Sequence, residues 1–197
     1  MKKQNRRIIP KICIFAGIGL LTAAVVALIL WYANIRIWEG RTADYVDALR
    51  TVMPEPQNCA PEERRDNTMP VLPLDGINFI GIVEIPRYGS TLPVCGDWGQ
   101  THKYPCQFDG SIYNRTLKIG ATTQRGQYDF YRELSVGDAV YFTDMEGNCY
   151  TLEITGLRYS KHADLAALEQ EDAALTLFIQ NIYSFEYLIV SCNSRGS

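Results

Sequence analysis

Leu175-Thr176-Leu177-Phe178-Ile179-Gln180-Asn181 and Glu186-Tyr187-Leu188-Ile189-Val190-Ser191-Cys192 are two apolar runs separated by a short connection. Each run has the length and the content of β-branched and aromatic residues that are typical of a buried strand. The short connection predicts that the two strands form an antiparallel pair at the C-terminal end of a β domain.

Further short runs of the same kind precede this pair. They are bounded by turn signals such as Tyr88-Gly89 and Glu146-Gly147-Asn148. Many short strands with regular turns predict a closed barrel or a sandwich. The expected strands are Asn78–Ile85, Thr91–Cys95, Leu117–Ala121, Ala139–Thr143, Tyr150–Tyr159, Leu175–Gln180 and Phe185–Cys192. Helical structure is expected only in short pieces, as a turn near Tyr128–Leu134 and around Asp164–Glu169. The 47% of apolar residues are enough to build the core of one such domain.

The N-terminal part of the chain predicts a membrane anchor. Residues 1–11 form a basic tail, and residues 12–32 form an uncharged apolar run long enough to cross a bilayer as a helix. Because positive residues stay on the cytoplasmic side, we expect a cytoplasmic N-terminus and an extracellular C-terminal domain, with a single span in the cell membrane. A cleaved signal peptide is the alternative, but its apolar region would be shorter and would end in a small-x-small site. Residues 33–73 are predicted to be a juxtamembrane helix followed by a Pro-rich linker, and residues 74–197 the folded domain.

Charge and cysteine content limit the possible functions. Five of the 19 basic residues precede the span and all 22 acidic residues follow it, so the outer part carries a net charge of −8. This excess of acid argues against a nucleic-acid partner. Five cysteines lie outside the span, and their spacing does not reveal which of them pair: Cys59, Cys95, Cys106, Cys149 and Cys192. With two histidines and no Cys-x-x-Cys motif, a zinc site is not expected.

Several of these segments, taken in order, resemble sortases, the membrane-anchored cysteine transpeptidases of mostly Gram-positive bacteria. The similar segments are Phe79–Pro86 with Thr91–Val94, Leu134–Phe142, Leu175–Phe178 and Leu188–Cys192. The segment Cys106–Tyr113 is similar to clostridial, class B-like members. The resemblance implies a closed eight-stranded β-barrel with short helices, whose groove holds an extended sorting peptide. It implies no cofactor.

The resemblance also locates the positions where the family's reactive residues stand. The position of the nucleophilic cysteine falls on Gln180, that of the arginine on Tyr187, and that of the histidine on Thr122. A glutamine amide has no ionisable nucleophile, and a threonine hydroxyl does not accept a proton as imidazole does. Tyrosine lacks the fixed charge and forked donors of arginine. We therefore expect no catalytic residues of the family type, and predict that these three residues contact a ligand instead.

Other residues could in principle replace the missing set. Cys192 follows Tyr187 by an odd spacing, so it should face the opposite side of the sheet and belong to the core. Cys95 and Cys106 bracket His102, which would permit a displaced Cys–His pair, although bridged or buried cysteines and a solvated histidine explain the same pattern. His162 and Arg125 are expected at the surface. Tyr183, Phe185 and Tyr187 alternate and could either stabilise the fold or form an aromatic floor for a peptide.

Three hypotheses for function follow. The first is an anchored, non-catalytic sortase-like domain that binds a peptide, a surface protein or a partner sortase. The second is an active transpeptidase that attaches surface proteins to cell wall or pili through a displaced catalytic set. The third is an unrelated anchored barrel with a structural role in the envelope.

Overall fold

The computed structural model describes residues 8–55, 57–59, 68–124, 126–161 and 172–194. The predicted helix near Asp164–Glu169, together with His162 and Arg125, lies outside these residues. The helices are α1 (Ile8–Val52) and the short 3₁₀ turns η2 (Pro86–Tyr88) and η3 (Trp98–Gln100). The strands are β1 (Gln57–Cys59), β2 (Leu72–Leu74), β3 (Ile77–Ile85), β4 (Ser90–Cys95), β5 (Cys106–Asp109), β6 (Leu117–Thr122), β7 (Ala139–Asp144), β8 (Asn148–Ser160), β9 (Leu175–Gln180) and β10 (Tyr187–Ser194).

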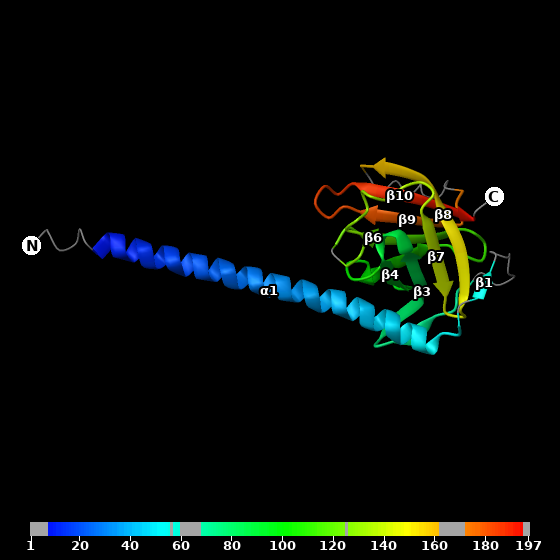
Figure 1. Ribbon diagram of the computed structural model, residues 1–197, viewed down its shortest axis with the longest axis horizontal. Helices are drawn as coiled ribbons and strands as arrows, with labels where there is room; N and C mark the ends of the chain where they lie inside the picture. The colour runs from blue at the N-terminus through cyan, green and yellow to red at the C-terminus, as the bar shows by residue number, and fades with distance from the viewer. Residues whose placement is uncertain (1–7, 56, 60–67, 125, 162–171, 195–197) are drawn as a thin grey trace, which may run out of the picture. The chain divides into compact units, whose positions relative to one another are not determined.

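Eight of the strands close into a barrel. Their order around the ring is β3, β4, β5, β6, β9, β10, β8 and β7, and β7 returns to β3 to complete it. The β4–β5 and β6–β9 pairs are parallel and the other pairs in the ring are antiparallel, so the barrel is mixed. Figure 1 shows these strands wrapped around one core, with β1 and β2 added at the margins. The predicted closed, mostly β barrel is therefore confirmed.

The expected strands all occur, within a few residues at their ends. The eighth barrel strand, β5, was not predicted, because Cys106-Gln107-Phe108-Asp109 is short and half polar. The segment near Tyr128–Leu134 forms hydrogen-bonded turns, with the Tyr131 N–H donating to the Tyr128 carbonyl at 3.1 Å. The structure shows no helix there among the residues it describes.

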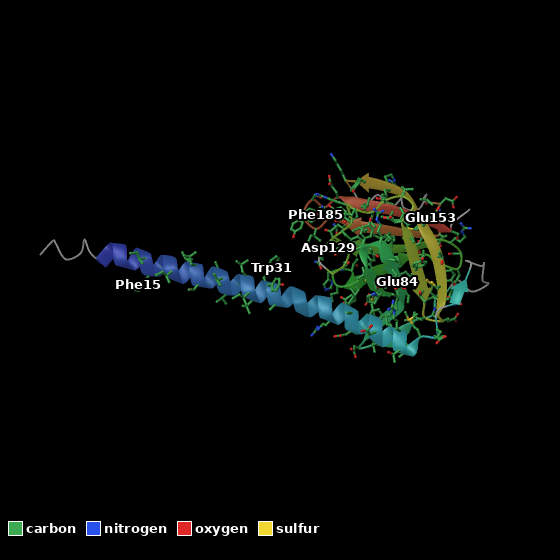
Figure 2. All side chains as sticks on the ribbon, viewed as in Figure 1. Phe15, Trp31, Glu84, Asp129, Glu153 and Phe185 are labelled. Carbon is green, nitrogen blue, oxygen red and sulfur yellow. The ribbon has the colours of Figure 1, made fainter. Side chains whose placement is uncertain are left out.

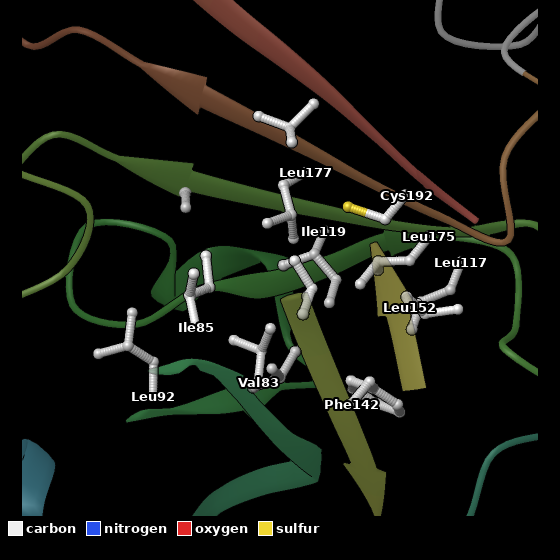
Figure 3. Close-up of a cluster of buried hydrophobic side chains, with 14 of the residues drawn as sticks. Val83, Ile85, Leu92, Leu117, Ile119, Phe142, Leu152, Leu175, Leu177 and Cys192 are labelled. Atoms are coloured by element: carbon white, nitrogen blue, oxygen red, sulfur yellow. The ribbon is translucent and has the colours of Figure 1, made fainter. Parts of the chain in front are cut away.

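The barrel interior is filled by aliphatic side chains from every side of the ring. Figure 3 shows Val83 and Ile85 from β3 directed at Leu177 from β9 and Cys192 from β10. These side chains are almost completely excluded from solvent. Strand β3 is buried on its outer face as well, because Phe79 and Ile82 pack against Val46 and Leu49 of α1. A strand buried on both faces reads as a continuous apolar run, as Phe79–Val83 does.

By contact, the chain divides into two compact units, Met1–Gly40 and Arg41–Ser197. The first unit contains an apolar stretch, Ile14–Ala33, which is long enough to cross a membrane. Its side chains, including Phe15 and Trp31 in Figure 2, are exposed along the helix. Its length and composition suit a signal anchor or a signal sequence. In the second unit, Arg41–Val52 supplies the side chains that cover β3.

A buried carboxylate fixes the turn that begins β7. Asp138 accepts hydrogen bonds from Arg87 Nη1 at 2.6 Å, from Tyr88 Oη at 2.9 Å and from the Ser135 N–H at 2.9 Å. Burial by itself would raise the pKa of Asp138, but these hydrogen bonds outweigh burial and hold the pKa below its usual range. The ionised carboxylate therefore stabilises the folded state.

Candidate functional site

The three residues predicted to contact a ligand lie in one row across three neighbouring strands. Thr122 ends β6 and is the register partner of Gln180, which ends the parallel strand β9. Gln180 is in turn the partner of Tyr187, which begins the antiparallel strand β10. Sequence-distant positions 122, 180 and 187 are thus neighbours, and all three line one open cavity of about 400 Å³.

An aromatic wall forms the other side of this cavity. Trp98, Phe108 and Phe178 contact one another, with ring centroids separated by 5.1 Å, 5.7 Å and 5.4 Å. Phe178 is buried, whereas Trp98 and Phe108 remain 44% and 38% exposed to solvent. Exposed aromatic rings that converge on a cavity provide apolar contact area for a ligand.

Gly120 makes this wall possible. A Cβ atom at position 120 would lie 2.4 Å from Cη2 of Trp98 and 2.8 Å from Cε2 of Phe178, closer than real Cβ contacts. Only glycine therefore allows the Trp98 indole to approach the β6 backbone this closely beside Phe178.

The polar row is held by hydrogen bonds from the loop after β6. The Thr122 N–H donates to Oε1 of Gln127 at 3.0 Å, and Nε2 of Gln127 donates to the Thr101 carbonyl at 3.4 Å. The Thr123 N–H donates to the Gln180 carbonyl at 2.9 Å. Gln127 is almost completely buried. Through these two hydrogen bonds it connects the end of β6 to Thr101, in the segment that also contains Trp98.

The cavity is almost free of formal charge. Thr122, Gln180 and Tyr187 supply neutral polar groups, and the described lining residues include no Asp, Glu, Lys or Arg. His102, from the loop after η3, is the titratable imidazole of the lining and is itself exposed. The sequence allowed either a displaced Cys–His pair or a solvated histidine at this position, and the structure shows an exposed His102 in a loop that borders the cavity.

The described residues that line the cavity include no cysteine. Cys192 is buried among barrel side chains on the face opposite Tyr187, as expected from its odd spacing. Burial raises the pKa of its thiol to about 12. Cys95 and Cys106 lie in a separate buried cluster with Tyr104. Their contacts are with the backbone of Asp97 and Tyr104, with the Thr101 side chain and with each other, and His102 is not among them.

The connection between β9 and β10 carries two further aromatic residues, which lie away from the cavity lining. Tyr183 is 84% exposed and Phe185 is 67% exposed, and Phe185 lies in the left-handed region with φ of 58°. Figure 2 labels Phe185 on this connection. Of the three alternating aromatic residues, Tyr187 alone is among the described residues that line the cavity.

Tyr187 also lines a second, smaller hollow of about 250 Å³, together with Arg132, Tyr159 and Glu186. The Arg132 side chain donates from Nε to Oη of Tyr131 at 2.9 Å. This arginine is part of the smaller hollow and is not among the described residues of the first cavity. Arg132 is thus close to the Tyr187 end of the row, while Thr122 and Gln180 are not among the described residues of its hollow.

No group of His, Cys, Asp or Glu among the described residues is arranged to hold a metal ion. An amide, a threonine hydroxyl and a phenol offer hydrogen bonds to a ligand backbone, and the aromatic wall offers apolar contact. This combination suits binding of a neutral, partly apolar ligand.

Comparison with known structures assigns the fold. No protein-family model matches the sequence, and no curated protein matches it. Sortase A from Corynebacterium diphtheriae superposes with a TM-score of 0.52 at 15% identity, over 60% of this chain and 61% of that chain. Sortase C1 of GBS pilus island 1 has a TM-score of 0.51 at 16% identity, over 60% and 65% of the two chains. Sortase C from Clostridium perfringens SM101 has a TM-score of 0.50 at 17% identity, over 67% and 78%.

The barrel thus has the sortase fold, at identities that establish the fold alone. The chain spans 61% of the length of the sortase A chain. The resemblance of this fold to sortases A and C is confirmed; the class B-like affinity of Cys106–Tyr113 and the role of the substituted positions stay predictions.

Proposed function

We propose that this protein is a membrane-anchored, extracellular sortase-fold domain that binds an extended peptide in the cavity without cleaving it. The observation that carries the proposal is the row of Thr122, Gln180 and Tyr187 in one cavity whose described lining contains no thiol. The apolar helix Ile14–Ala33 supports the anchor, because sortases are themselves membrane-anchored.

The chemistry of the cavity supports a peptide as the ligand. The Gln180 amide offers both a donor and an acceptor, which is the pattern that a peptide backbone presents in return. The aromatic wall of Trp98, Phe108 and Phe178 can receive an apolar side chain. Such a peptide could belong to a sorting signal, a surface protein or a partner sortase, and the three sources are distinguished by experiment.

Because the nucleophile is missing, we expect very slow cleavage of a bound peptide. A glutamine at the position of the attacking thiol leaves no group that could form a thioester, and the imidazole and guanidinium positions are also substituted. In triad enzymes, removing one member typically costs a factor of about 10⁴ or more, and the losses are not independent. Turnover of a bound peptide should therefore be negligible.

His102 favours a second candidate function. An imidazole that borders the cavity would be needed by an active enzyme with a displaced catalytic set. That enzyme would attach surface proteins to cell wall or pili, and it would also need a thiol that moves into the cavity. It predicts a peptide-dependent acyl-enzyme that disappears with one specific Cys→Ala substitution. The third hypothesis, an unrelated barrel with a structural role, is less favoured because the strand order does not depart from the sortase fold.

Binding can be tested with the full chain in detergent and a panel of sorting-signal peptides. We expect Gln180→Ala to weaken the Kd about two- to twelvefold, the range that corresponds to one net hydrogen bond. Val136→Ala is the matched control, because this exposed side chain lies in the turn before β7. The proposal fails if no peptide of the panel binds, or if both variants bind as the unaltered chain does.

A further inference from the structure

Cys95 and Cys106 lie opposite each other where strands β4 and β5 pair, the place in the barrel with the fewest backbone pairings between neighbouring strands. Strands β4 and β5 pair through a single register position, Cys95 opposite Cys106, whereas β6 and β9 pair along their whole length. The Cys95 N–H donates to the Pro105 carbonyl at 2.8 Å beside this position. The β4–β5 seam therefore depends on very few interactions compared with the other seams of the ring.

The two side chains are positioned for a covalent bond. Both residues are completely excluded from solvent and belong to one buried cluster with Tyr104. Neighbouring strands lie about 4.7–4.9 Å apart, which falls within the Cα separation of about 4.4–6.8 Å that disulfides require. Both are free thiols in the structure, and each perturbs the pKa of the other, so the two side chains lie close together.

The local interactions give the two sulfurs different acidities. The hydrogen bond from the Cys106 thiol lowers the pKa of Cys95, and the Asp97 N–H, 3.3 Å from the Cys95 sulfur, acts in the same direction. The same thiol–thiol hydrogen bond, together with burial, raises the pKa of Cys106. In the folded chain Cys95 is therefore the more acidic thiol of the pair.

We propose that Cys95 and Cys106 form an intramolecular disulfide in the exported protein, which closes the β4–β5 seam and fixes the loop that borders the cavity. The thiolate of one cysteine attacks the disulfide of an oxidant, either a thiol oxidoreductase or a small-molecule disulfide, and releases one thiolate of that oxidant. The other cysteine then loses its proton and attacks the sulfur of the first cysteine in the mixed disulfide. The second oxidant thiolate leaves, so two protons and two electrons pass from the cysteines to the oxidant.

The disulfide would also affect the cavity, because the loop that it closes contributes residues to the cavity lining. The loop between the two cysteines carries Trp98, Gly99, Thr101 and His102, all of which line the cavity. A disulfide across the ends of this loop restricts the conformations open to it in the unfolded chain. It also holds Trp98 at the wall before a ligand arrives, which reduces the ordering cost of binding.

Register and burial make this pair specific. Cys192 packs in the barrel core on β10, and Cys149 lies opposite Asn58 and Thr143 on β8. Because both sulfurs of the Cys95–Cys106 pair are buried, an oxidant can reach them only before the seam closes. The bond should therefore form during folding and resist reductants in the native protein.

The direct test is a thiol map of the unaltered full chain, exported to an oxidising compartment and extracted in detergent. The protein is denatured with an alkylating reagent and without reductant, then digested and analysed by mass spectrometry. We expect a linked peptide that contains unalkylated Cys95 and Cys106, with Cys192 alkylated in the same sample as the internal control. Alkylation of both Cys95 and Cys106, or a link from either one to another cysteine, would overturn the proposal. No peptide ligand is used, so failure of the proposed binding function would not affect this result.

A set of variants tests whether the bond stabilises the seam. Three variants should each lower the Tm by about the same amount: Cys95→Ala, Cys106→Ala and the double variant. The expected decrease is roughly 6–12 °C for a disulfide that closes a loop of this length. Unfolding the unaltered chain in reductant and refolding it should lower its Tm, because the bond is then lost. The same treatment should leave the Tm of the double variant unchanged. Cys192→Ala serves as control, because its loss should add to that of Cys95→Ala. Additive losses at Cys95 and Cys106 would contradict a shared bond.

Discussion

Gly120→Ala is the substitution that most directly probes the aromatic wall. The new methyl group would lie 2.4 Å from Cη2 of Trp98 and 2.8 Å from Cε2 of Phe178. Phe178 is only 6% exposed and has no room to move, whereas Trp98 is 44% exposed and can swing toward solvent. We therefore expect Trp98 to leave the wall and the barrel to stay folded.

The size of the effect follows from two contributions. Adding a methyl group to a well-packed region typically costs about 1–3 kcal/mol. Because Trp98 can swing toward solvent, most of this strain is relieved, and the cost becomes the loss of its ring contacts with Phe108 and Phe178, at about 0.5–1.5 kcal/mol each. We expect the free energy of unfolding to fall by about 1–3 kcal/mol, and peptide affinity to fall about tenfold if the wall contributes about 1.4 kcal/mol to binding.

The assay measures thermal unfolding and peptide Kd of the full chain in detergent. Gly156→Ala is the matched control, because a Cβ at position 156 would meet its nearest neighbour, Ser191, at 3.7 Å, an ordinary contact. Gly156 lies on β8 and is not among the residues that line the cavity. If Gly120→Ala kept both the Tm and the peptide Kd of the unaltered chain, the inferred role of the wall would be wrong.

Three further predictions concern the core, the buried carboxylate and the thiols. Leu49→Ala, at a fully buried position, should cost about 2–5 kcal/mol of unfolding free energy, whereas Val52→Ala, at a 65% exposed position, should cost little; chemical denaturation compares the two. Because the pKa of Asp138 is depressed in the folded state, its stabilisation is present above about pH 4 and is lost as the pH falls through the folded pKa. Asp138→Asn should therefore lower the Tm at pH 7, and equal Tm values for both proteins at pH 7 would contradict this. Cys192 should resist alkylation until the protein unfolds, whereas Gln180→Cys should react at once because position 180 lines the cavity; mass spectrometry of the folded protein checks both.

Much of the barrel could be predicted from sequence because its strands are bounded by clear turn signals. Strand β9 begins and ends where the apolar run Leu175–Gln180 does. Strand β5 escaped prediction because it is short and makes a single pairing with β4, so tertiary closure and not local propensity defines it. The pairing of β6 with β9 joins segments far apart in the chain, and periodicity carries no information about such partners.

The candidate site could likewise be predicted only in part from the sequence. The row of Thr122, Gln180 and Tyr187 could be located through the family resemblance, because the resemblance fixes positions along strands whose register then aligns them. The aromatic wall could not, since Trp98 lies in a loop and Phe108 on the unpredicted strand. The one local signal is Gly120 in the interior of β6, since a glycine inside a strand indicates a close approach by another group without revealing that the group is Trp98.

The central claim is that the cavity binds a peptide and has no nucleophile to cleave it. The most direct test is intact-mass analysis of the full chain after incubation with a sorting peptide that it binds, with and without hydroxylamine. The account predicts an unchanged protein mass and an intact peptide under both conditions. A peptide-dependent increase in protein mass that hydroxylamine removes would show an acyl-enzyme, and would contradict the account.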